Sequence, residues 1–382
     1  MQLSVIILNY NVKYFLEVCI KSVQKAIQNL DAEIIVVDNN STDGSKEMMQ
    51  QVFPEITYIF NDYNAGFPKG NNQGVDVAKG KYICILNPDT IVAENTFSSI
   101  LEYVKTLPNF GILGCKLIDG AGNFLPECKR GVPTPWVAFT KVLGLYKFFP
   151  KSKSFNQYYA QHVSENENGN VDILVGAFMF LERDLYIKVG GFDEGCFMYS
   201  DDIDLSYLSL KEGKQNYYFS EISCIHFKGE STLKDGTYMN RFKEAMQFFY
   251  RKHFNPSFIF DIMMNVGIFL FAFKKKTEVV KVKIIPNEYV VLSKESLSVR
   301  DINGISFTEF SNYDDFIFYL EKNNQNKLEI LYDSNSFSYE NYIKLLERFK
   351  NSFFTFKIKP ANSEFFLGSN DKNDRGEVLF LK

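Results

Sequence analysis

The sequence lacks the features of a disulfide-bonded or zinc-binding chain. Its six cysteines are scattered and form no Cys-x-x-Cys pair, which is typical of reduced thiols in a cytoplasmic protein. It also lacks an excess of basic charge, because 42 Lys and Arg stand against 46 Asp and Glu, and this excludes a general nucleic-acid-binding field. The N-terminal residues lack a basic region, and their apolar run is too short for a secretory signal peptide.

The chain has neither the composition of a disordered protein nor an evident internal repeat. Apolar residues make up 46% of the sequence and charged residues 23%, which is an ordinary globular balance. The length of 382 residues is about twice that of a usual domain, so we expect one large domain and a smaller one.

Short apolar segments alternate with helix-like segments over residues 1–120. Strands that are buried on both faces of a parallel sheet have this nearly continuous apolar character. The alternation predicts an α/β fold with a mostly parallel central sheet and crossover helices. The predicted strands are Leu3–Leu8, Glu33–Val37, Ile56–Phe60 and Tyr82–Leu86, and the predicted helices include Tyr14–Gln28 and Ser45–Val52.

The loops after these four strands are rich in Asn and Asp. Any one of them is explained by a turn or a helix cap, because both residues perform these roles. Four in succession favour a polar crevice for a ligand, since ligands of such sheets bind beyond the carboxyl ends of the strands. The loops comprise residues 9–11, 38–44, 61–72 and 87–89.

Residues 121–170 lose this alternation. We expect an irregular surface insertion there that faces an acceptor molecule. A strand is predicted at Asp172–Leu181, and a helix is predicted from the 201–204 segment to Glu212, with Gly213 as its C-cap.

Several short motifs follow one another in a fixed order over residues 1–255. They are SVIILNYN (4–11), VVDNNSTDG (36–44), NAGF (64–67), GNNQG (70–74), LNPD (86–89), GGFD (190–193), DDID (201–204) and HFKGEST (226–232). Together they resemble the signature of glycosyltransferase family 2, in its rhamnosyltransferase-like and galactofuranosyltransferase-like branch. The resemblance implies a GT-A fold and an inverting, metal-dependent transfer of sugar from a nucleotide diphosphate sugar.

The first motifs contain the predicted nucleotide-sugar-binding residues. Asp38, at the end of the second strand, can accept a hydrogen bond from the imide of a uracil or thymine base, or it can cap the following helix. The resemblance favours nucleotide binding. The set that it implies is Asn9, Asn11, Asp38, Asn40, Gly66, Gly70, Asn71 and Asn87.

Two residues are predicted to hold a divalent metal, Mn²⁺ or Mg²⁺. Asn87-Pro88-Asp89 stands where the family has its Asp-x-Asp metal motif, which leaves Asp89 as the carboxylate that can bridge a metal to the diphosphate. A Pro-Asp turn is the alternative. His226 opens the His-x-x-Gly-x-Ser/Thr motif of the family, which favours a metal ligand over a structural histidine.

The 201–204 segment contains the predicted catalytic carboxylates. Asp202 matches the general base of the family, and Asp201 replaces its glutamate with a shorter side chain. Acidic residues also offset a helix macrodipole, but three in four residues repel one another. Asp193 and Arg130 are the predicted acceptor-binding residues.

The strongly apolar segment Ser257–Phe273 lies between basic clusters. As a helix it would measure about 25 Å, short of the roughly 30 Å hydrocarbon core, so a helix lying in the membrane interface is favoured over one buried between domains. The expected organisation is a GT-A domain at 1–255, this helix at 256–276, and a small α/β accessory domain at 277–382. Its predicted strands are Val279–Ile285, Lys327–Tyr332 and Phe353–Ile358, and its predicted helices are Asp314–Lys322 and Tyr339–Lys350.

The sequence therefore predicts a glycosyltransferase that is peripheral at the cytoplasmic face of the cell membrane and extends a glycan or lipid-linked glycan acceptor. A synthase that loads sugar onto polyprenyl phosphate and a non-catalytic nucleotide-sugar-binding module remain alternatives. The first would need further basic contacts for the acceptor phosphate, and only Lys129 and Arg130 are obvious.

Overall fold

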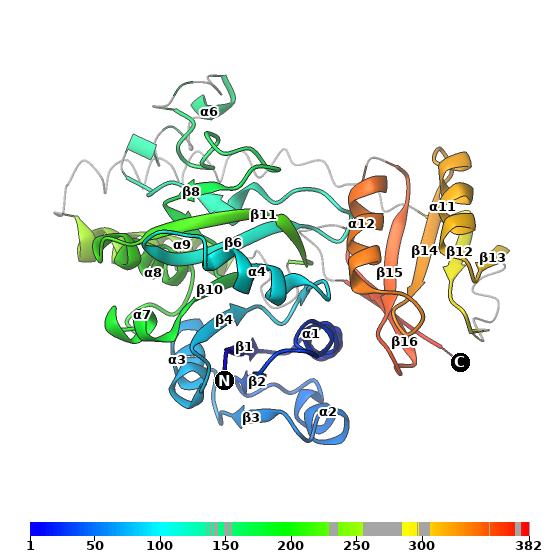
Figure 1. Cartoon of the computed structure of the whole chain (residues 1–382), viewed down its shortest axis with the longest axis horizontal. Helices are drawn as coiled ribbons and strands as arrows, with labels where there is room; N and C mark the ends of the chain where they lie inside the picture. The colour runs from blue at the N-terminus through cyan, green and yellow to red at the C-terminus, as the bar shows by residue number, and fades with distance from the viewer. Residues whose placement is uncertain are drawn as a thin grey trace.

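The computed structural model describes residues 1–134, 136–137, 140, 144–148, 152, 155–228, 236–254, 285–295, 297, 306–350, 352–370 and 376–381. Within these residues two large β-sheets are accompanied by helices. Figure 1 shows the first sheet in blue to green and the second in yellow to red.

The first sheet has nine strands in the order β3-β2-β1-β4-β10-β6-β11-β5, with β8 paired to β11. Strands β1, β2, β3, β4, β6 and β11 run in one direction, and β5, β8 and β10 run in the other. The predicted α/β fold with a mainly parallel sheet is confirmed. Its strands are β1 (Leu3–Asn9), β2 (Ala32–Asp38), β3 (Thr57–Phe60), β4 (Tyr82–Leu86), β5 (Thr90–Ile91), β6 (Phe110–Ile118), β8 (Gly169–Val171), β10 (Phe178–Glu182) and β11 (Gln215–His226).

The helices and the small elements of this region complete the α/β pattern. A two-stranded sheet pairs β7 (Lys129–Arg130) with β9 (Ile173–Leu174), and a single 3₁₀ turn spans Pro126–Cys128. The helices are α1 (Lys13–Ala26), α2 (Ser45–Val52), α3 (Phe67–Val77), α4 (Thr96–Val104), α6 (Leu145–Phe148), α7 (Arg183–Lys188), α8 (Asp201–Lys211) and α9 (Gly236–His253).

One predicted strand is wrong. Instead of one strand over Asp172–Leu181, the chain forms β9 and β10 with a break at residues 175–177. The break frees the backbone N–H of Gly176 from sheet pairing, and this N–H donates a hydrogen bond to Asp202 at 3.1 Å. The predicted helix and its C-cap are confirmed, because α8 ends at Lys211 and Gly213 has a φ of 75°.

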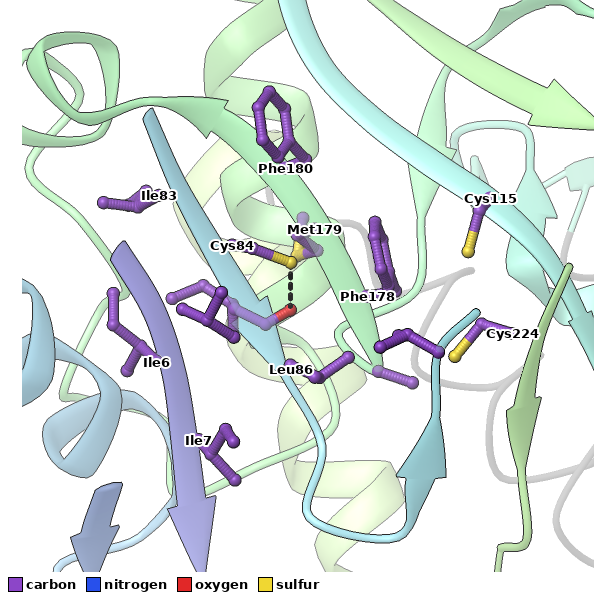
Figure 2. Close-up of a cluster of buried hydrophobic side chains, with 14 of the residues drawn as sticks. Ile6, Ile7, Ile83, Cys84, Leu86, Cys115, Phe178, Met179, Phe180 and Cys224 are labelled. Atoms are coloured by element: carbon purple, nitrogen blue, oxygen red, sulfur yellow. Dashed lines mark hydrogen bonds between the residues drawn. The ribbon is translucent and has the colours of Figure 1, made fainter. Parts of the chain in front are cut away.

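The core of the first sheet is apolar and contains buried thiols. Figure 2 shows β1, β4 and β10 contributing side chains to one cluster, together with Cys115 and Cys224. All six cysteines are buried and free, in agreement with the predicted reduced thiols. Burial raises the pKa of the Cys84 thiol well above its usual value, so this sulfur is an inert packing group.

The second sheet has six strands in the order β13-β12-β14-β15-β16-β17. Strands β12 to β15 are parallel, and β16 and β17 continue the sheet antiparallel. Both predicted helices and two predicted strands are present, whereas Val279–Ile284 lies outside the described residues. The elements are β12 (Glu288–Leu292), β13 (Ser306–Phe310), α11 (Tyr313–Lys322), β14 (Leu328–Asp333), α12 (Tyr339–Phe349), β15 (Thr355–Lys359), β16 (Phe365–Gly368) and β17 (Glu377–Phe380).

The two sheets share a hydrophobic core. Side chains of α1, β5 and β11 belong to the same buried cluster as β14, β15 and α12, and Phe15 packs edge-on against Phe227 at 5.1 Å. The carboxylate of Glu94 accepts hydrogen bonds from the backbone N–H groups of Tyr339 and Glu340, which caps the N-terminus of α12. The second sheet is thus packed against the strands that end at the candidate site.

Among the described residues, no helix is both long and apolar enough to cross a membrane. The segment Ser257–Phe273, with the basic residues that follow it, lies outside these residues.

Candidate active site

The ends of β1 and β2 are joined by a hydrogen-bond network around Asp38. Its Oδ2 accepts from the side-chain amide of Asn9 at 2.6 Å, and its Oδ1 accepts from the backbone N–H of Ser41 at 2.7 Å. Asn9 and Asp38 are both fully buried. Asn9 therefore orients the carboxylate of Asp38. The amide nitrogen of Asn9 is used for hydrogen bonds within this network, to Asp38 and to Ser41, and not for a ligand.

Asn11 and Asn40 stand at the surface beside this network. Both have positive φ angles, 55° and 63°, which Asn adopts more readily than most residues. The Oδ1 of Asn11 accepts from the backbone N–H of Thr42 at 2.8 Å, so the two loops hold each other. Of the predicted nucleotide-binding residues, these two are exposed.

Gly66, just before α3, and Gly70, within α3, allow close packing. At Gly66, φ is 85° and a Cβ would lie 2.9 Å from the ring of Phe197, while at Gly70 a Cβ would lie 2.3 Å from Leu8. The fully buried amide of Asn71 donates to the backbone carbonyl of Phe67 at 2.9 Å. Gly70 and Asn71 therefore set the position of α3 against β1, and Gly66 sets the position of the loop before it.

Asp89 and His226 meet where β4 and β11 end. The Oδ1 of Asp89 lies 3.3 Å from the Nε2 of His226, and the amide of Asn87 lies 3.3 Å from the same nitrogen. The backbone N–H of Phe227 donates to the carbonyl of Asp89 at 3.0 Å, which holds the two segments together. Residues 139 positions apart thus form one polar cluster at the edge of the sheet.

This cluster fits a divalent metal in its chemistry. Asp89 Oδ1 and His226 Nδ1 are buried without a hydrogen-bond partner in the described structure, and a carboxylate with an imidazole suits Mn²⁺. The described residues contain no group of three or more His, Cys, Asp or Glu side chains that could enclose a metal. Further ligands must therefore come from outside this pair, and diphosphate oxygens are hard ligands of the required kind.

Asp202 is held by a cation and a backbone N–H. Its Oδ2 accepts from Arg130 Nη2 at 2.5 Å and from the N–H of Gly176 at 3.1 Å. A Cβ at Gly176 would lie 3.4 Å from both Asp202 and the ring of Phe67, so the start of α8 lies beside the loop that begins α3. The backbone N–H of Asn87 donates to the carbonyl of Ala177 at 3.0 Å, which links this region to the Asp89 cluster.

Asp201 differs from its neighbour because no cation among the described residues forms an ion pair with it. Its Oδ1 is buried without a hydrogen-bond partner in the described structure. Burial, and then the negative charge of Asp202, raise the pKa of Asp201 from 3.8 to about 7. Such shifts are frequent in catalytic sites, where a carboxyl group must exchange a proton near neutral pH.

Asp193 is engaged by Lys252 of α9, at 2.5 Å. Although burial works in the opposite direction, this hydrogen bond lowers the pKa of Asp193. Lys252 also contacts Asp204 at 2.8 Å, and His253 contacts the other oxygen of the Asp204 carboxylate. These contacts of Lys252 and His253 in α9 with Asp204 in α8 were not predicted, because no local sequence feature links residues about 50 positions apart.

Tyr58 on β3 was also missed by sequence reasoning. Burial, and then the nearby carboxylate of Asp38, raise the pKa of its hydroxyl group. Its position in the strand next to β2 places it near Asp38, and only the strand pairing of Val36 with Tyr58 reveals this.

The mainly parallel sheet, with polar clusters where its strands end, agrees with the GT-A glycosyltransferase fold that the motifs predict. A model described as glycosyl transferase family 2 matches residues 4–190. This region of the chain belongs to glycosyl transferase family 2, as the motifs predicted, and the protein is a glycosyltransferase.

In two relatives the region that matches this chain covers most of the relative's length. An N-acetylglucosaminyl-diphospho-decaprenol L-rhamnosyltransferase of Mycobacterium tuberculosis is 25% identical over 244 residues, covering 61% of this chain and 78% of its own. The rhamnosyltransferase WbbL of Escherichia coli is 28% identical over 221 residues, covering 54% and 78%. Among solved structures, a mannosyltransferase from Pyrobaculum calidifontis in complex with GDP-Man and Mn²⁺ has a TM-score of 0.46 at 16% identity, covering 73% of this chain and 76% of its own.

Proposed function

We propose that this glycosyltransferase transfers a sugar, with inversion at the anomeric carbon, from a UDP- or dTDP-linked donor to a hydroxyl group of a lipid-linked glycan. The observation that supports it best is the convergence of three clusters, around Asp38, Asp89 and Asp202, on one part of the sheet. They supply a hydrogen-bond acceptor for a base, ligands for a metal–diphosphate complex, and a carboxylate for an acceptor proton.

The Asp38 cluster suits a base with an imide N–H. Each oxygen of its carboxylate already accepts one hydrogen bond, and each can accept a second. Because Asn9 and Ser41 fix both oxygens, the carboxylate is oriented before the nucleotide arrives, which reduces the entropic cost of binding. Uracil and thymine carry the required N–H.

Asp89 and His226 would hold the divalent metal, either Mn²⁺ or Mg²⁺. When bound, the metal offsets the negative charge that develops on the departing nucleotide diphosphate. Asn87 lies against the imidazole of His226 and so contributes to its orientation.

Asp202 acts as the general base. The acceptor hydroxyl oxygen attacks the anomeric carbon, the bond from this carbon to the diphosphate oxygen breaks, and the acceptor proton passes to Asp202. One displacement of this kind inverts the configuration. Asp202 is suited to this role because Oδ1 has no hydrogen-bond partner among the described residues while Oδ2 is fixed.

A hydroxyl acceptor is favoured over polyprenyl phosphate by the cations near the site. A phosphate acceptor needs available basic groups, but Arg130 is paired with Asp202, and Lys129 donates to the backbone carbonyls of Tyr159, Ala160 and Val163. The two cations that the alternative relied on are thus both occupied within the fold.

A lipid-linked acceptor is supported by the composition of residues 128–164, the segment that contains Arg130. No acidic residue occurs from 128 to 164, a stretch that contains six Lys and Arg. Within it Trp136 and Phe148 are 48% and 76% exposed. Aromatic and basic residues without acidic ones suit an anionic membrane surface. The named relative from M. tuberculosis acts on a lipid diphosphate acceptor, which agrees with a peripheral location at the cytoplasmic membrane face.

We propose that the chain is organised as a catalytic unit at 1–255, a connecting or membrane-associated helix at 256–276 and an accessory unit at 277–382. Replacing Lys274, Lys275 and Lys276 with Glu tests the membrane role of this helix in co-sedimentation with anionic vesicles. Each Lys contributes about 1 kcal/mol near such a surface, so the variant is expected in the supernatant at low salt. Wild-type protein that does not bind these vesicles would contradict a membrane role.

The decisive test of the function is donor binding followed by transfer. Calorimetry with UDP, dTDP and GDP, with and without Mn²⁺, is expected to show metal-dependent binding of UDP or dTDP. The matching UDP- and dTDP-sugars are then incubated with a lipid-diphosphate-linked N-acetylglucosamine acceptor, and the anomeric configuration of the product is read by NMR. Binding of GDP alone, or a product with retained configuration, would contradict the proposal.

A further inference from the structure

Arg130 forms an ion pair with the candidate base at a place where little water reaches. The side chains of Arg130 and Asp202 are 12% and 11% exposed, and Nη2 lies 2.5 Å from Oδ2. The same nitrogen lies 3.4 Å from the backbone carbonyl of Leu174. The Nε of Arg130 is buried without a hydrogen-bond partner in the described structure, so the guanidinium group is enclosed and not presented to a sugar.

We propose that Arg130 is a positioning residue for Asp202 rather than an acceptor-binding residue, and that it keeps the negative charge of the Asp201–Asp202 pair on Asp202. This inference rests on the proposed role of Asp202 as the general base. Arg130 and the N–H of Gly176 share Oδ2, which directs the remaining oxygen, Oδ1, toward the acceptor.

Two adjacent buried carboxylates need a cation if one of them is to stay ionised. Desolvation and mutual repulsion both favour protonation, and a cation in contact with one carboxylate counteracts both. Arg130 contacts Asp202 directly at 2.5 Å, whereas burial and then the charge of Asp202 raise the pKa of Asp201 to about 7. The third carboxylate of α8, Asp204, is paired separately with Lys252 and His253.

Within the part of the chain that the structure describes, three groups act on Asp202. They are Arg130 from β7, Asp201 from its own helix, and the backbone N–H of Gly176. The side chain of Tyr158 also interacts with Arg130 through a hydrogen bond. Removing Arg130 therefore removes the cation that faces the pair.

The backbone around Arg130 restrains this side chain. Arg130 pairs with Ile173 across the β7–β9 sheet, and the amine of Lys129 is held by three backbone carbonyls. A guanidinium group that is anchored in this way loses little entropy when it binds a carboxylate.

The experiment compares Arg130→Met, Arg130→Lys and Arg130→Ala with wild-type protein over pH 5–9. We expect the acidic limb of kcat/KM in Arg130→Met to move about 1–3 pH units upward, because an adjacent opposite charge shifts a carboxyl by this amount. At pH values below the acidic limb of the wild type the rate falls roughly 10- to 1,000-fold, with donor affinity unchanged. Arg130→Lys restores part of the rate, and millimolar guanidinium restores part of it in Arg130→Ala.

Arg183→Met is the matched control. Arg183 is also half-buried, also has a buried Nε without a partner, and donates to the backbone carbonyl of Ala78, away from the site. Its loss is expected to lower the melting temperature without moving the pH profile and without rescue by guanidinium. A higher acceptor KM with an unmoved acidic limb in Arg130→Met would overturn the proposal and assign Arg130 to acceptor binding.

A second measurement separates this inference from the proposed function. At pH 8, Arg130→Met is expected to lower the melting temperature strongly, because it leaves a buried carboxylate without its cation. In an Asp202→Asn background the same substitution is expected to cost much less. Equal losses in the two backgrounds would overturn the pairing, whereas absence of transfer from UDP- and dTDP-sugars by wild-type protein would overturn the proposed function alone.

Discussion

Two regions of the site differ in which polar atoms they leave without a hydrogen-bond partner. We call the cluster around Asp38 the nucleotide edge and the clusters around Asp89 and Asp202 the transfer edge. At the nucleotide edge, both oxygens of Asp38 accept hydrogen bonds, and within the described residues the buried atoms without a partner belong to neutral groups, the amides of Asn9 and Asn71 and the hydroxyl of Tyr58. At the transfer edge, atoms of Asp89, Asp201 and His226, all ionisable groups, are buried without a partner within the described residues.

This difference is informative because an unsatisfied buried ionisable group is costly to a fold. A chain that keeps several of them in one place is using them for ligands or protons that arrive later. Under the proposed function, the hydrogen bonds of the nucleotide edge are already formed before a base binds, whereas the transfer edge would be completed by metal, diphosphate and acceptor. Substitutions at the two edges should therefore fail in different ways.

The largest effect is expected at the transfer edge from Asp202→Asn. Loss of a general base costs about 10²–10⁴ in rate, and donor affinity should stay nearly unchanged because the base acts on the acceptor. Single-turnover kinetics with saturating donor, together with calorimetry, measures both quantities. Turnover like that of the wild type would reject Asp202 as the base.

Asp89→Ala and His226→Ala come next. Each removes one proposed metal ligand, and we expect donor affinity in Mn²⁺ to fall about 10- to 100-fold, as losses in metal sites commonly do. Affinity for the donor without metal should change little, which serves as the internal control. Unchanged affinity in Mn²⁺ for both variants would show that the metal assignment is wrong.

Asp201→Asn is expected to alter the pH dependence of stability. In the folded state the Asp201 pKa is about 7, above its ordinary value of 3.8, so the folded protein binds the extra proton between these pH values. Stability therefore falls as pH rises from about 4 to 7, and this penalty, on the order of a few kcal/mol, is fully present above pH 7. Asn removes it.

The measurement is chemical denaturation of wild type and Asp201→Asn at pH 5 and pH 8. The variant should gain stability relative to wild type on going to pH 8. A constant difference between the two proteins would mean that Asp201 is already ionised in the folded state at pH 5.

The smallest effect is expected at the nucleotide edge from Asn9→Ala. It removes the amide that donates to Asp38 Oδ2, so this buried carboxylate oxygen is left without that hydrogen bond. The expected cost is about 1–3 kcal/mol of folding stability. Metal dependence of donor binding should persist. Thermal unfolding and calorimetry test this, and loss of metal dependence would contradict the separation of the two edges.

Much of the fold was predictable because local patterns agree with the tertiary structure. The strand Tyr82–Leu86 and the helix Ser45–Val52 have the predicted bounds, since apolar runs and Gly44 at the helix start act over a few residues. Strands β12, β13, β16 and β17 were missed. Their short runs, such as Phe365–Gly368, become strands only through pairing with partners formed elsewhere.

The sequence alone determined the family, the alternation of strands and helices in the first part of the chain and the residue types available for chemistry, because these depend on local motifs and on periodicity. Tertiary structure alone decided which of those residues meet. It brought Asp89 to His226, Arg130 to Asp202 and Lys252 to Asp193, pairs that lie 59 to 137 positions apart. Such pairing is set by the order of strands in the sheet and by the packing of α9 on α8, and the charge state of Asp201 follows from the burial that this packing creates.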